Sequence, residues 1–600
     1  MTNFLHFLIW LWFVCSLQTV TFVAQAANVL AVFPSVWKSH YLYGRRLMQQ
    51  YVALYNHSVT LVSPYDSANE TRLQNIREIR VQGMHDNWVE MGLTFNVEHL
   101  RQKSVMERFT RLIYAGTTNV DLLLNDAQVR KLLLSGEQYD LLVVDLFLSD
   151  ALLGLAHFYK VPAVVISPSG ANTWLNQMTG NPQNSALDPS IFLPYSEHMS
   201  LWERSLNTLM SIFEKLTYNF FHMISQQSIY VKHFHSLCQH NDSNGLLPHH
   251  QDLTKNISVV LLNSHPVVQY PRAYLPNMVE IGGSHISLNA ADLELPMHLS
   301  NFIAEAPNGV IYVSLGANLR TADLAREKLD ALLHAFATLQ DMRVLLKWEL
   351  DQFDYDLPPN VFLADWFPQQ AVLAHENVKI FITTAGLMSL IEALYFKTPL
   401  VTLPVHPEQE VAARRMQQQG CAILLPFDAL SYKDLMQAIH AIRTNLTYFE
   451  NIRRLSALLK SSDVFGTPTT KALQYMELVL QTSGADHLKS HANQFGFFRT
   501  ELVDVLLILL AGASCIIAVP FLVTCCILRK SYHSYLNAMS SLPHAWENGA
   551  GGEALVSRRR SSTSASASSS SSSSSPGEKL SKSVSYNPKR LVVVEQSDSI

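Results

Sequence analysis

Short apolar runs rich in β-branched residues recur in two series along this chain, with helical patterns between them. The first series comprises residues 29–33, 58–63, 139–145 and 163–167, and the second comprises 309–316, 343–348, 361–363, 380–383 and 400–403. Parallel strands need a crossover connection of a dozen or more residues, usually a helix. Helical patterns over residues 42–55, 322–339 and 387–395 fit such crossovers. The alternation therefore predicts α/β structure with parallel sheets covered on both faces.

The chain is also too long for a single core. Its 600 residues exceed the size at which one hydrophobic core stops growing. The two series of strands therefore indicate two αβ domains, and we expect them to join near the segment from Asn263 to Gly283. A further helical segment from Pro468 to Leu480 leads toward an apolar stretch near the carboxyl end.

The N-terminus has the pattern of a secretory signal peptide. An apolar run extends from Phe4 to Val23, and Ala24-Gln25-Ala26 follows it as a small-x-small cleavage pattern. We predict a cleaved signal peptide over residues 1–26, although no Lys or Arg precedes the run. A buried first strand or an uncleaved anchor is the alternative interpretation.

A second apolar stretch predicts a membrane-spanning helix at residues 505–528. This stretch carries no charged residue, and Arg529-Lys530 follow it at once. About 24 residues at ~1.5 Å each are long enough to cross a hydrocarbon core of ~30 Å. Basic residues directly after a span mark its cytoplasmic side. The prediction is a single-pass type I protein, with residues 27–500 in the lumen.

Glycosylation sequons support a luminal location for the region before the span. They begin at Asn56, Asn69, Asn241, Asn256 and Asn445. Such sequons also arise by chance, so they support the topology without establishing it. The expected location is the membrane of the endoplasmic reticulum, with the folded domains in the lumen.

The segment after the span has a different composition. Residues 568–575 are an unbroken serine run, preceded by Arg558-Arg559-Arg560-Ser561-Ser562. Such a composition cannot bury enough apolar surface to fold, so we predict a disordered cytosolic tail over residues 529–600. Basic residues ahead of serines are typical of a phosphorylation site, and a solvated spacer is the alternative.

The distribution of charge argues against binding to nucleic acid. The net charge is −5, but from Arg529 onward nine Lys and Arg stand against five Asp and Glu, so the rest of the chain is about −9. No basic face is evident in the large domains, which excludes a nucleic-acid partner from the expected functions.

Cysteines and metal-ligand motifs are sparse. Before the span, and after the predicted signal, the chain has only Cys238 and Cys421. These two could pair, but nothing in the sequence places them close together, and the chain is no disulfide scaffold. No CxxC or HExxH motif is present, so we expect no metal ion.

The stretch from Trp366 to Ala413 carries the most specific motif. It reads Trp366-Phe367-Pro368-Gln369-Gln370, His375, Phe381-Ile382-Thr383-Thr384-Ala385-Gly386, Ser389, Glu392, Pro399, Pro404 and Glu408-Gln409. The stretch resembles the sugar-nucleotide-binding signature of the UDP-glycosyltransferases. From about residue 29 to residue 530 the chain is similar to membrane-bound family-1 UDP-glycosyltransferases of animals, of the UDP-glucosyl and glucuronosyl type. Residues 263–265, 271–272, 276–277, 280–283, 484–485 and 487–488 add to this resemblance.

The resemblance implies a GT-B fold with twin Rossmann-like domains. The domain at residues 27–283 is then expected to bind the acceptor and the domain at residues 284–500 the UDP-sugar. The UDP-sugar would be a donor substrate, with no cofactor. A small lipophilic acceptor, the membrane, and association with itself or with related transferases are the other partners that the resemblance implies.

Two residues of the first domain are candidates for catalysis. His40 follows Pro34 and Ser39 at a turn between strand and helix, where the family places its general base. A histidine with a pKa near neutral suits that role. Asp145 ends an apolar strand, at the position of the family's carboxylate that orients the histidine. Taken alone, His40 could be an exposed loop residue and Asp145 a helix N-cap.

The second domain carries the candidate donor site. By resemblance, Trp366 stacks on uracil, Gln369 contacts the base or ribose, and Glu392 accepts hydrogen bonds from the ribose hydroxyls. Ser389 lies in the first turn of a helix, whose N-terminus favours a diphosphate without a metal. Glu408 and Gln409 would contact sugar hydroxyls. Gly316, Thr384 and Gly386 complete the set of candidate binding residues. Taken alone, Trp366 could be a core residue and Glu392 a surface one.

The chain departs from the family at positions expected to hold phosphate. Thr384 stands where the family has a histidine, Ala317 where it commonly has a serine, and Ala412 where it has an asparagine. Lys397 replaces a glycine, which reshapes at most a turn. Each lost hydrogen bond to a charged group is worth roughly 1–3 kcal/mol, although backbone donors remain.

Two functional hypotheses follow. The first is an inverting transfer of a hexose from a UDP-sugar, UDP-glucose being the expected donor, to a lipophilic acceptor hydroxyl. The second is a catalytically weakened or dead homologue that binds a small lipophile or partners an active paralogue. An adhesion receptor with a signalling tail has only the topology in its favour. We also expect Trp174, Phe192, Trp202, Phe220 and Phe221 to shape an apolar acceptor pocket, although each could be a plain core residue.

Overall fold

The structure is a computed structural model, which describes residues 26–66, 75–90, 104–239, 247–317, 319–349, 353, 355–461, 464 and 466–541. Except for Ala26, the predicted signal peptide lies outside the described residues. The predicted tail beyond residue 541 and the sequons at Asn69 and Asn241 also lie outside them.

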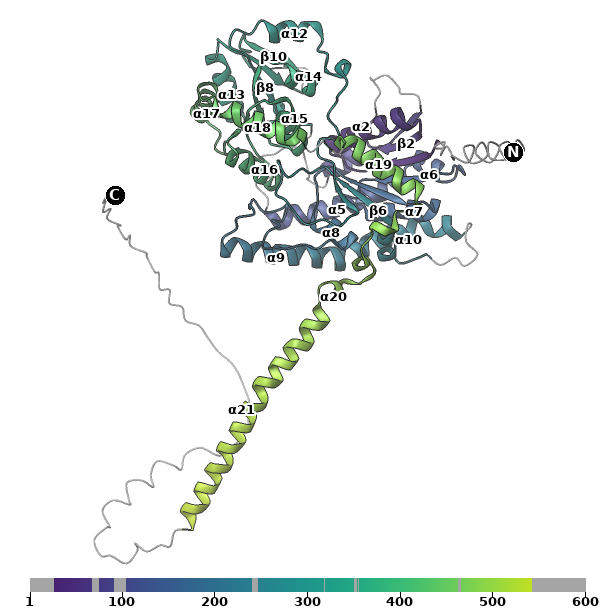
Figure 1. The fold of residues 1–600 in the computed structure, drawn as a ribbon, viewed down its shortest axis with the longest axis vertical. Coiled ribbons are helices and arrows are strands. Elements are labelled where there is room, and N and C mark those ends of the chain that lie inside the picture. Colours follow the sequence, from purple (N-terminus) through teal and green to yellow (C-terminus); the bar gives the residue numbers. More distant parts are fainter. Residues whose placement is uncertain are drawn as a thin grey trace, which may run out of the picture. The chain divides into compact units, whose positions relative to one another are not determined.

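The first half of the chain builds a parallel sheet of seven strands among the described residues, in the order β3-β2-β1-β4-β5-β6-β7 (Figure 1). The strands are β1 (Asn28–Val32), β2 (Ser58–Ser63), β3 (Ile76–Arg80), β4 (Leu141–Val144), β5 (Ala163–Ser167), β6 (Ile257–Leu262) and β7 (Met278–Glu280). Every residue of β4, β5 and β6 is buried. Such continuously apolar strands are expected where helices cover both faces of a parallel sheet.

Helices and short helical turns connect these strands. They are α2 (Lys38–Tyr55), α3 (Met84–Glu90), α5 (Val105–Asn125), α6 (Ala127–Leu133), η1 (Asp150–Leu152), α7 (Leu153–Tyr159), α8 (Thr173–Thr179), α9 (Leu201–Thr217), the π-helical turn η2 (Tyr218–His222), α10 (Met223–Gln239), α11 (His250–Leu253) and η3 (Thr254–Asn256). The larger core, on one face of the sheet, contains Leu30, Phe109 and Phe234. The core on the other face packs α2 against β1 and β2.

The second half builds a parallel sheet of six strands among the described residues, in the order β10-β9-β8-β11-β12-β13. The strands are β8 (Val310–Ser314), β9 (Arg343–Lys347), β10 (Val361–Ala364), β11 (Val378–Thr383), β12 (Leu400–Thr402) and β13 (Ala422–Leu424). Its helical elements are η4 (Ala290–Leu293), α12 (Met297–Ala304), η5 (Thr321–Asp323), α13 (Arg326–Thr338), α14 (Gln369–Ala374), α15 (Leu387–Phe396), α16 (Pro407–Gln418), α17 (Tyr432–Thr444) and α18 (Thr447–Ser461). Two hydrophobic cores cover its two faces.

Helix α19 (Pro468–Gln481) returns to the first sheet after the second is complete. Leu473 and Met476 are buried in the core that α2 forms with the first sheet. The carboxylate of Glu477 accepts hydrogen bonds from the Tyr51 hydroxyl and the His57 ring, each at 2.7 Å. The predicted domain boundaries did not include this return, and they stay a prediction. After α19 come η7 (Asp486–Leu488), η8 (His491–Gln494) and α20 (Phe497–Thr500).

Among the described residues, α21 (Val503–Ser540) is the one helix long and apolar enough to cross a membrane. It contains the predicted span and continues to Ser540. The prediction of disorder from residue 529 is therefore wrong for residues 529–540. No proline or glycine lies between Arg529 and Ser540, so nothing in the sequence interrupts the helical hydrogen bonds there.

No disulfide joins the two cysteines of the folded region. Cys421 is buried and Cys238 is partly buried. Burial raises the pKa of the Cys421 thiol to about 12. Cys421 therefore stays protonated at neutral pH and packs as a small apolar residue.

Candidate active site

His40 and Asp145 form a buried pair at the carboxyl end of the first sheet. The Nδ1 atom of His40 lies 2.6 Å from Oδ2 of Asp145, and the two residues are 4% and 1% exposed. The other carboxylate oxygen of Asp145 accepts the backbone N–H of Phe147 at 3.0 Å. A carboxylate held in this way fixes the orientation and the tautomer of the imidazole. Nδ1 is then the nitrogen bound to the carboxylate, and Nε2 is left to accept a proton.

The order of the strands explains why these two residues meet across 105 positions of sequence. Strands β1 and β4 are neighbours, with Val32 in register with Val144. Because the strands are parallel, the residues that follow them emerge at the same edge of the sheet. Asp145 follows β4 directly, and α2 begins at Lys38. The prediction placed His40 in a turn before a helix at Leu42, but it lies in the first turn of α2.

A cavity of about 320 Å³ lies between the carboxyl ends of the two sheets. His40 lines it from the first sheet. From the second sheet it is lined by six of the predicted donor residues, namely Gly316, Thr384, Gly386, Ser389, Glu408 and Gln409. The structure therefore brings seven of the eleven predicted site residues to one cavity. Asp145 lies behind His40, and Trp366, Gln369 and Glu392 lie outside the lining.

Apolar side chains form much of the wall on the first-sheet side. Trp37, Trp88, Phe147 and Phe192 line the cavity, and Trp37 lies 5.3 Å from His40 between ring centroids. Phe192 was among the predicted pocket residues, whereas the other three were not predicted. Such a wall binds apolar surface without strong directional contacts.

Three residues predicted to shape the acceptor pocket do not do so. Trp202, Phe220 and Phe221 are 70%, 43% and 67% exposed on α9 and η2, and none lines the cavity. Trp174 is buried beside Phe192 and Phe147 without reaching the lining. The prediction failed because an apolar helical pattern does not show which face of the helix points inward.

The turn between β11 and α15 forms the floor of the cavity. The hydroxyl of Thr384 donates to the carbonyl oxygen of Leu315 at 3.2 Å, so this side chain is already engaged with the backbone. Ala385 has φ of +64°, a left-handed conformation that costs a residue with a Cβ roughly 1–2 kcal/mol. Gly316, across the turn, has φ of +101°, which glycine adopts readily.

The first turn of α15 leaves backbone donors at the cavity. Gly386 precedes the helix, and Leu387, Met388 and Ser389 line the cavity with it. The first N–H groups of a helix have no partner within it, and the helix dipole adds partial positive charge there. The geometry therefore offers an anion site made largely of main chain.

A buried hydrogen-bond cluster lies behind that turn. The side-chain amide of Gln369 donates to Ser389 Oγ at 3.1 Å and to Glu392, and Tyr312 donates to the Gln369 oxygen at 3.2 Å. Gln370 donates to the other oxygen of Glu392 at 2.9 Å. Burial raises the pKa of the Glu392 carboxyl to about 7, against smaller opposing effects of the two glutamine amides. The structure thus joins Gln369, Ser389 and Glu392, as predicted for one site.

His285 is a neighbour of this cluster that the sequence did not indicate. Its Nε2 lies 3.5 Å from a carboxylate oxygen of Glu392. Burial lowers the pKa of His285 to about 4. The ring is therefore neutral at physiological pH and adds no positive charge beside the carboxylate. Only its place in the segment that joins the two sheets could have drawn attention to it.

Trp366 lies beyond the end of β10 with an exposed ring. The residue is 45% exposed, which excludes the alternative that it is a core residue. Two ammonium groups approach the ring, Lys38 Nζ at 4.4 Å and Lys347 Nζ at 5.7 Å from its centroid. Because Lys38 belongs to α2, residues of both halves of the chain meet at this ring. Lys347 also donates to the carbonyl oxygen of Gly316 at 3.0 Å.

Glu408 and Gln409 occupy the first turn of α16. Burial raises the pKa of the Glu408 carboxyl to about 7, and His40 is the largest of the opposing influences. Gln409 caps its own helix, because its side-chain oxygen accepts the backbone N–H groups of Val405 at 3.0 Å and His406 at 3.2 Å. The sequence predicted contacts of Gln409 with a sugar, whereas the structure also gives its side-chain oxygen this capping role.

The raised pKa of Glu392 predicts a dependence of stability on pH. Its value exceeds the ordinary 4.5, so the folded state binds the proton more tightly than the unfolded state. The corresponding stability is fully present below about pH 4.5 and is lost as the pH rises through about 7. Thermal or urea unfolding measures the free energy of unfolding at each pH. Its decrease between about pH 5 and pH 8 should be about 2–3 kcal/mol smaller for Glu392→Gln than for the wild type.

Glu327, exposed on α13, provides the control for this experiment. The free energy of unfolding of Glu327→Gln should depend on pH in the same way as that of the wild type. Parallel curves for Glu392→Gln and the wild type would show that the Glu392 carboxyl is not the group that resists ionisation.

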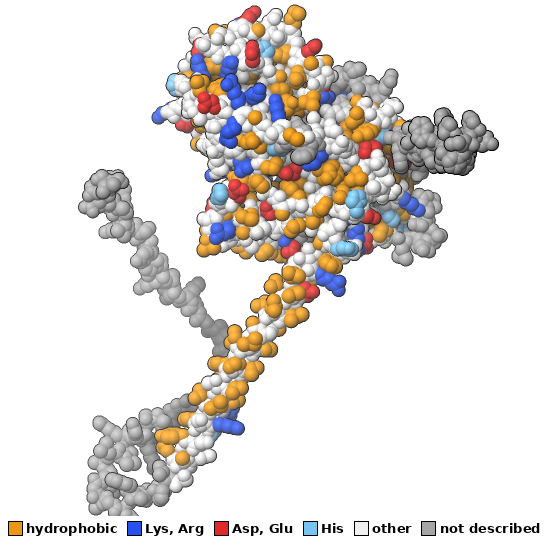
Figure 2. Space-filling view, in the orientation of Figure 1, with side chains coloured by type: hydrophobic (Ala, Val, Ile, Leu, Met, Phe, Trp, Pro, Cys, Tyr) orange, Lys and Arg blue, Asp and Glu red, His pale blue; other side chains and the backbone are white. Residues whose placement is uncertain are grey.

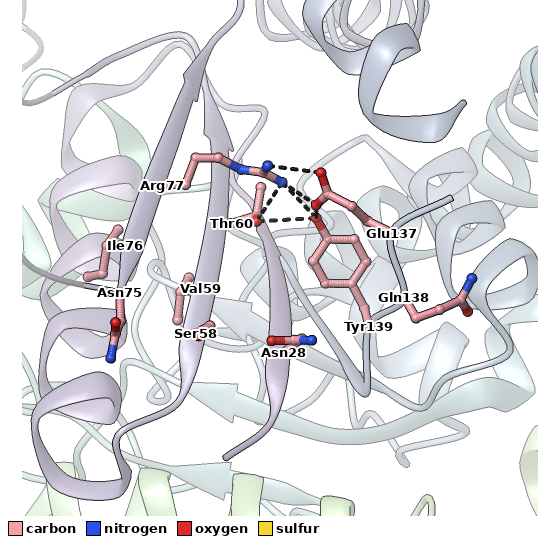
Figure 3. Close-up of a pocket in the computed structure, with 10 residues that line it drawn as sticks. All are labelled: Asn28, Ser58, Val59, Thr60, Asn75, Ile76, Arg77, Glu137, Gln138 and Tyr139. Carbon is pink, nitrogen blue, oxygen red and sulfur yellow. Dashed lines mark hydrogen bonds and ion pairs between the residues drawn. The ribbon is translucent and has the colours of Figure 1, made fainter. Parts of the chain in front are cut away.

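A separate hollow lies at the opposite, amino-terminal edge of the first sheet (Figure 3). Arg77 reaches into it and donates to Glu137 Oε1 at 2.9 Å and to the Tyr139 hydroxyl at 3.1 Å. These charges satisfy one another, and no predicted site residue lies there. Within the described ranges, no group of three or more His, Cys, Asp or Glu side chains could hold a metal ion.

Comparisons with known proteins agree with this geometry. Residues 44–540 match the family described as "UDP-glucoronosyl and UDP-glucosyl transferase". UDP-glycosyltransferase UGT5 of Dactylopius coccus is 29% identical over 494 residues, covering 81% of this chain and 90% of that protein. The ecdysteroid UDP-glucosyltransferase of Lymantria dispar multicapsid nuclear polyhedrosis virus is 29% identical over 498 residues, covering 81% of this chain and 94% of that protein.

A solved structure has the same fold. The calicheamicin glycosyltransferase CalG4 superposes with a TM-score of 0.52 at 20% identity, covering 76% of this chain and 99% of that one. This likeness confirms the predicted fold class, GT-B with twin Rossmann-like sheets. The family match covers far more than half of the chain and includes both sheets. The chain therefore belongs to the UDP-glucuronosyl and UDP-glucosyl transferase family and is a UDP-glycosyltransferase.

Proposed function

We propose that this enzyme transfers glucose from UDP-glucose to a hydroxyl group of a small lipophilic acceptor, with inversion at the anomeric carbon. One observation carries the proposal: the buried His40–Asp145 pair opens into the same cavity as the N-terminus of α15. The aromatic wall formed by Trp37, Phe147 and Phe192 favours an apolar acceptor. The name of the related viral enzyme, an ecdysteroid UDP-glucosyltransferase, supports both the sugar and the class of acceptor.

In this mechanism His40 is the general base. Its Nε2 atom takes the proton from the acceptor hydroxyl, and the oxygen attacks the anomeric carbon as the bond to the UDP oxygen breaks. The Asp145 carboxylate, 2.6 Å from Nδ1, stabilises the imidazolium that forms. A single displacement of this kind converts the α-linked sugar of the donor into a β-glycoside.

The residues of the second sheet hold the donor. Trp366 stacks on uracil, Gln369 contacts the base or ribose, and Glu392 accepts hydrogen bonds from the ribose hydroxyls. The diphosphate lies at the N-terminus of α15, against Gly386 and Ser389, with Gly316 and Thr384 across the turn. Glu408 and Gln409 face the sugar. The exposed ring of Trp366 and the hydrogen bond from Gln369 to Ser389 support this arrangement.

The replacement of histidine by Thr384 leaves the diphosphate held mainly by backbone N–H groups. The Thr384 hydroxyl is bonded to Leu315, and Ala317 and Ala412, which line the same cavity, offer no donor. Thr384→His should therefore tighten UDP binding by about tenfold, because a hydrogen bond to a charged group is worth ~1.5–3 kcal/mol. Calorimetric titration of UDP measures this effect, and Thr384→Val, which cannot donate, is the control. Equal affinity of the histidine variant and the wild type would contradict the assignment of Thr384 to the diphosphate.

We further propose a type I membrane protein of the endoplasmic reticulum, in which residues 1–26 are a cleaved signal and residues 27–500 are luminal. Helix α21 then spans the membrane and the tail is cytosolic. Asn56, Asn256 and Asn445, which begin sequons in the described part of the chain, are all exposed. These positions are compatible with luminal glycosylation.

The test of the function is a product assay on the full chain reconstituted in bilayers. UDP-glucose is supplied with a hydroxylated steroid or an N-acylsphingosine as the acceptor. The expected result is one UDP released for each acceptor consumed, with a β-glycoside identified by NMR. An α-glycoside would contradict the single displacement. UDP-glucose that binds without turnover with any hydroxylated lipophile would favour the non-catalytic alternative.

A further inference from the structure

Helix α9, the turn η2 and helix α10 form one long helical segment with an exposed apolar face. We name as the α9–α10 stripe the six residues Leu209, Ile212, Leu216, Phe220, Phe221 and Ile224, which are all exposed, Phe221 and Ile224 by about two thirds. Leu201 and Trp202 extend the face at the start of α9. Figure 1 places α9 along the lower edge of the folded part, and hydrophobic side chains are visible along that edge in Figure 2.

The spacing and the charge of the stripe distinguish it from scattered surface hydrophobics. Apart from the adjacent pair Phe220 and Phe221, its positions recur every three or four residues, so they share one helical face. Between Ser205 and Val231 the only Asp, Glu, Lys or Arg residues are Glu214 and Lys215. Glu214 is buried, and the Lys215 ammonium lies 2.6 Å from the carboxylate of Glu501. The exposed face is therefore apolar and without unpaired charge over several helical turns.

The opposite face of the same segment is buried and carries polar groups beside apolar side chains such as Met210 and Met223. Asn207, Ser211, Glu214, His222 and Gln226 are at most 3% exposed. The Asn207 oxygen accepts the N–H of Ser190 at 2.8 Å, and the Gln226 oxygen accepts the N–H of Ala151 at 2.8 Å. These buried bonds fix the rotation of the helices. The segment therefore packs on the protein through a face that mixes polar and apolar side chains, while its outer face is apolar.

An apolar face of this size costs free energy in water. Burying a large apolar side chain is worth about 1.5–3 kcal/mol, and contiguous apolar patches on soluble proteins usually mark an interaction site. Turning the helices over would leave the buried N–H groups of Ser190 and Ala151 without their acceptors, at ~1–3 kcal/mol for each one. An apolar medium against the outer face would remove the cost of exposing these side chains to water.

The stripe is continuous with the segment that enters α21. The rings of Phe220 and Phe497 are in edge contact, with centroids 5.8 Å apart, and Lys215 binds Glu501. Phe498 and Leu502 are more than half exposed, and the next residue, Val503, begins α21. Residues 497–502, which lead directly into α21, are therefore in contact with the helical segment that carries the stripe.

We propose that the α9–α10 stripe lies in the interface of the same membrane and forms a second attachment beside α21. An amphipathic helix in this position buries its apolar face at the boundary between headgroups and acyl chains. The polar side of α9 also holds the cavity wall, because Ser190, which lines the cavity, bonds to Asn207 and Glu214. The attachment therefore places the acceptor side of the cavity close to the bilayer, where lipophilic acceptors are concentrated.

The test uses the full chain with a protease site inserted between Leu502 and Val503, reconstituted in vesicles of phosphatidylcholine and phosphatidylethanolamine. Neutral lipids exclude attraction by charge. After cleavage, the folded part should stay on the vesicles at high salt and be released by detergent. The variant with Ile212→Glu, Phe221→Glu and Ile224→Glu should lower the bound fraction roughly tenfold or more, because three carboxylates replace inserted apolar groups.

A matched variant changes exposed apolar residues elsewhere. Met297→Glu, Leu446→Glu and Leu458→Glu, all at exposed positions in the second half of the chain, should leave the bound fraction unchanged. A second measurement needs no charge substitution: brominated lipids should quench tryptophan emission in the wild type more than in Trp202→Phe.

Three outcomes separate the possibilities. Release of the wild-type folded part as a monomer upon cleavage would overturn the proposal. Release as a dimer that the stripe variant dissociates would also overturn it, because a second copy of the chain would then cover the stripe. Carbonate extraction before cleavage tests α21 separately. Release of the uncleaved chain from the vesicles would show that α21 does not span the bilayer.

Discussion

Replacing His40 with alanine should lower kcat roughly 10²–10⁴-fold, the usual contribution of a general base. The affinity for UDP should not change, because His40 belongs to the first half of the chain and all the proposed UDP contacts belong to the second. The His40–Asp145 pair also predicts that Asp145→Asn lowers kcat, since the amide cannot stabilise an imidazolium as a carboxylate does. Steady-state kinetics at saturating donor measures these effects.

The double variant makes the test sharper. Because the two residues act as one unit, His40→Ala combined with Asp145→Asn should be no slower than His40→Ala alone. If the two residues contributed independently, their fold reductions in kcat would instead multiply. That result would contradict the coupling inferred from the 2.6 Å contact. Undiminished turnover in His40→Ala would show that another group removes the proton.

Replacing Trp366 with alanine should weaken UDP binding by about 1–3 kcal/mol, the value of one stacked base on an aromatic ring. This corresponds to roughly a five- to 150-fold rise in Kd. The ring is exposed and lies beside Gln369 in sequence, at the turn that opens α14. Once the donor is saturating, kcat should recover most of its wild-type value, because the ring does not touch the reacting atoms. Titration of UDP and the dependence of the rate on donor concentration measure both quantities.

Trp366→Phe is the matched control for this experiment. It keeps an aromatic face and should retain most of the affinity. If alanine and phenylalanine weaken binding equally, the size of the indole, or its contact with Lys38 at 4.4 Å, matters more than stacking. Unchanged affinity in Trp366→Ala would place the uracil elsewhere.

Most strands could be predicted from the sequence because buried parallel strands are continuous apolar runs. Four of the described strands were missed. Strands β3, β7 and β13 lie at the edges of their sheets; β3 has three charged residues among its five, and β7 and β13 are only three residues long. Strand β6 was also missed, although it is a buried and mainly apolar run. The return of α19 to the first sheet was also missed. Its burial depends on contacts with Tyr51 and His57, more than 400 positions away along the chain, which no local pattern records.

The candidate site was predictable where residues follow parallel strands, since strand order alone brings such residues together. His40 and Asp145 are the example. The hydrogen bond of Thr384 to Leu315 and the capping role of Gln409 were not predictable, because each depends on the local path of the backbone. The outward orientation of Phe221 was missed for another reason. Its segment carries apolar side chains on both the buried and the exposed face, so the apolar pattern does not show which side points inward.

The central claim is that the second sheet binds a UDP-sugar although Thr384, Ala317 and Ala412 offer the diphosphate no side-chain donor. Calorimetric titration of UDP into the reconstituted full chain tests this most directly, beside Thr384→His and Trp366→Ala. We predict micromolar binding by the wild type, which Thr384→His tightens and Trp366→Ala weakens. Absence of binding by the wild type, with binding restored in Thr384→His, would contradict the account and identify a transferase scaffold that has lost its donor.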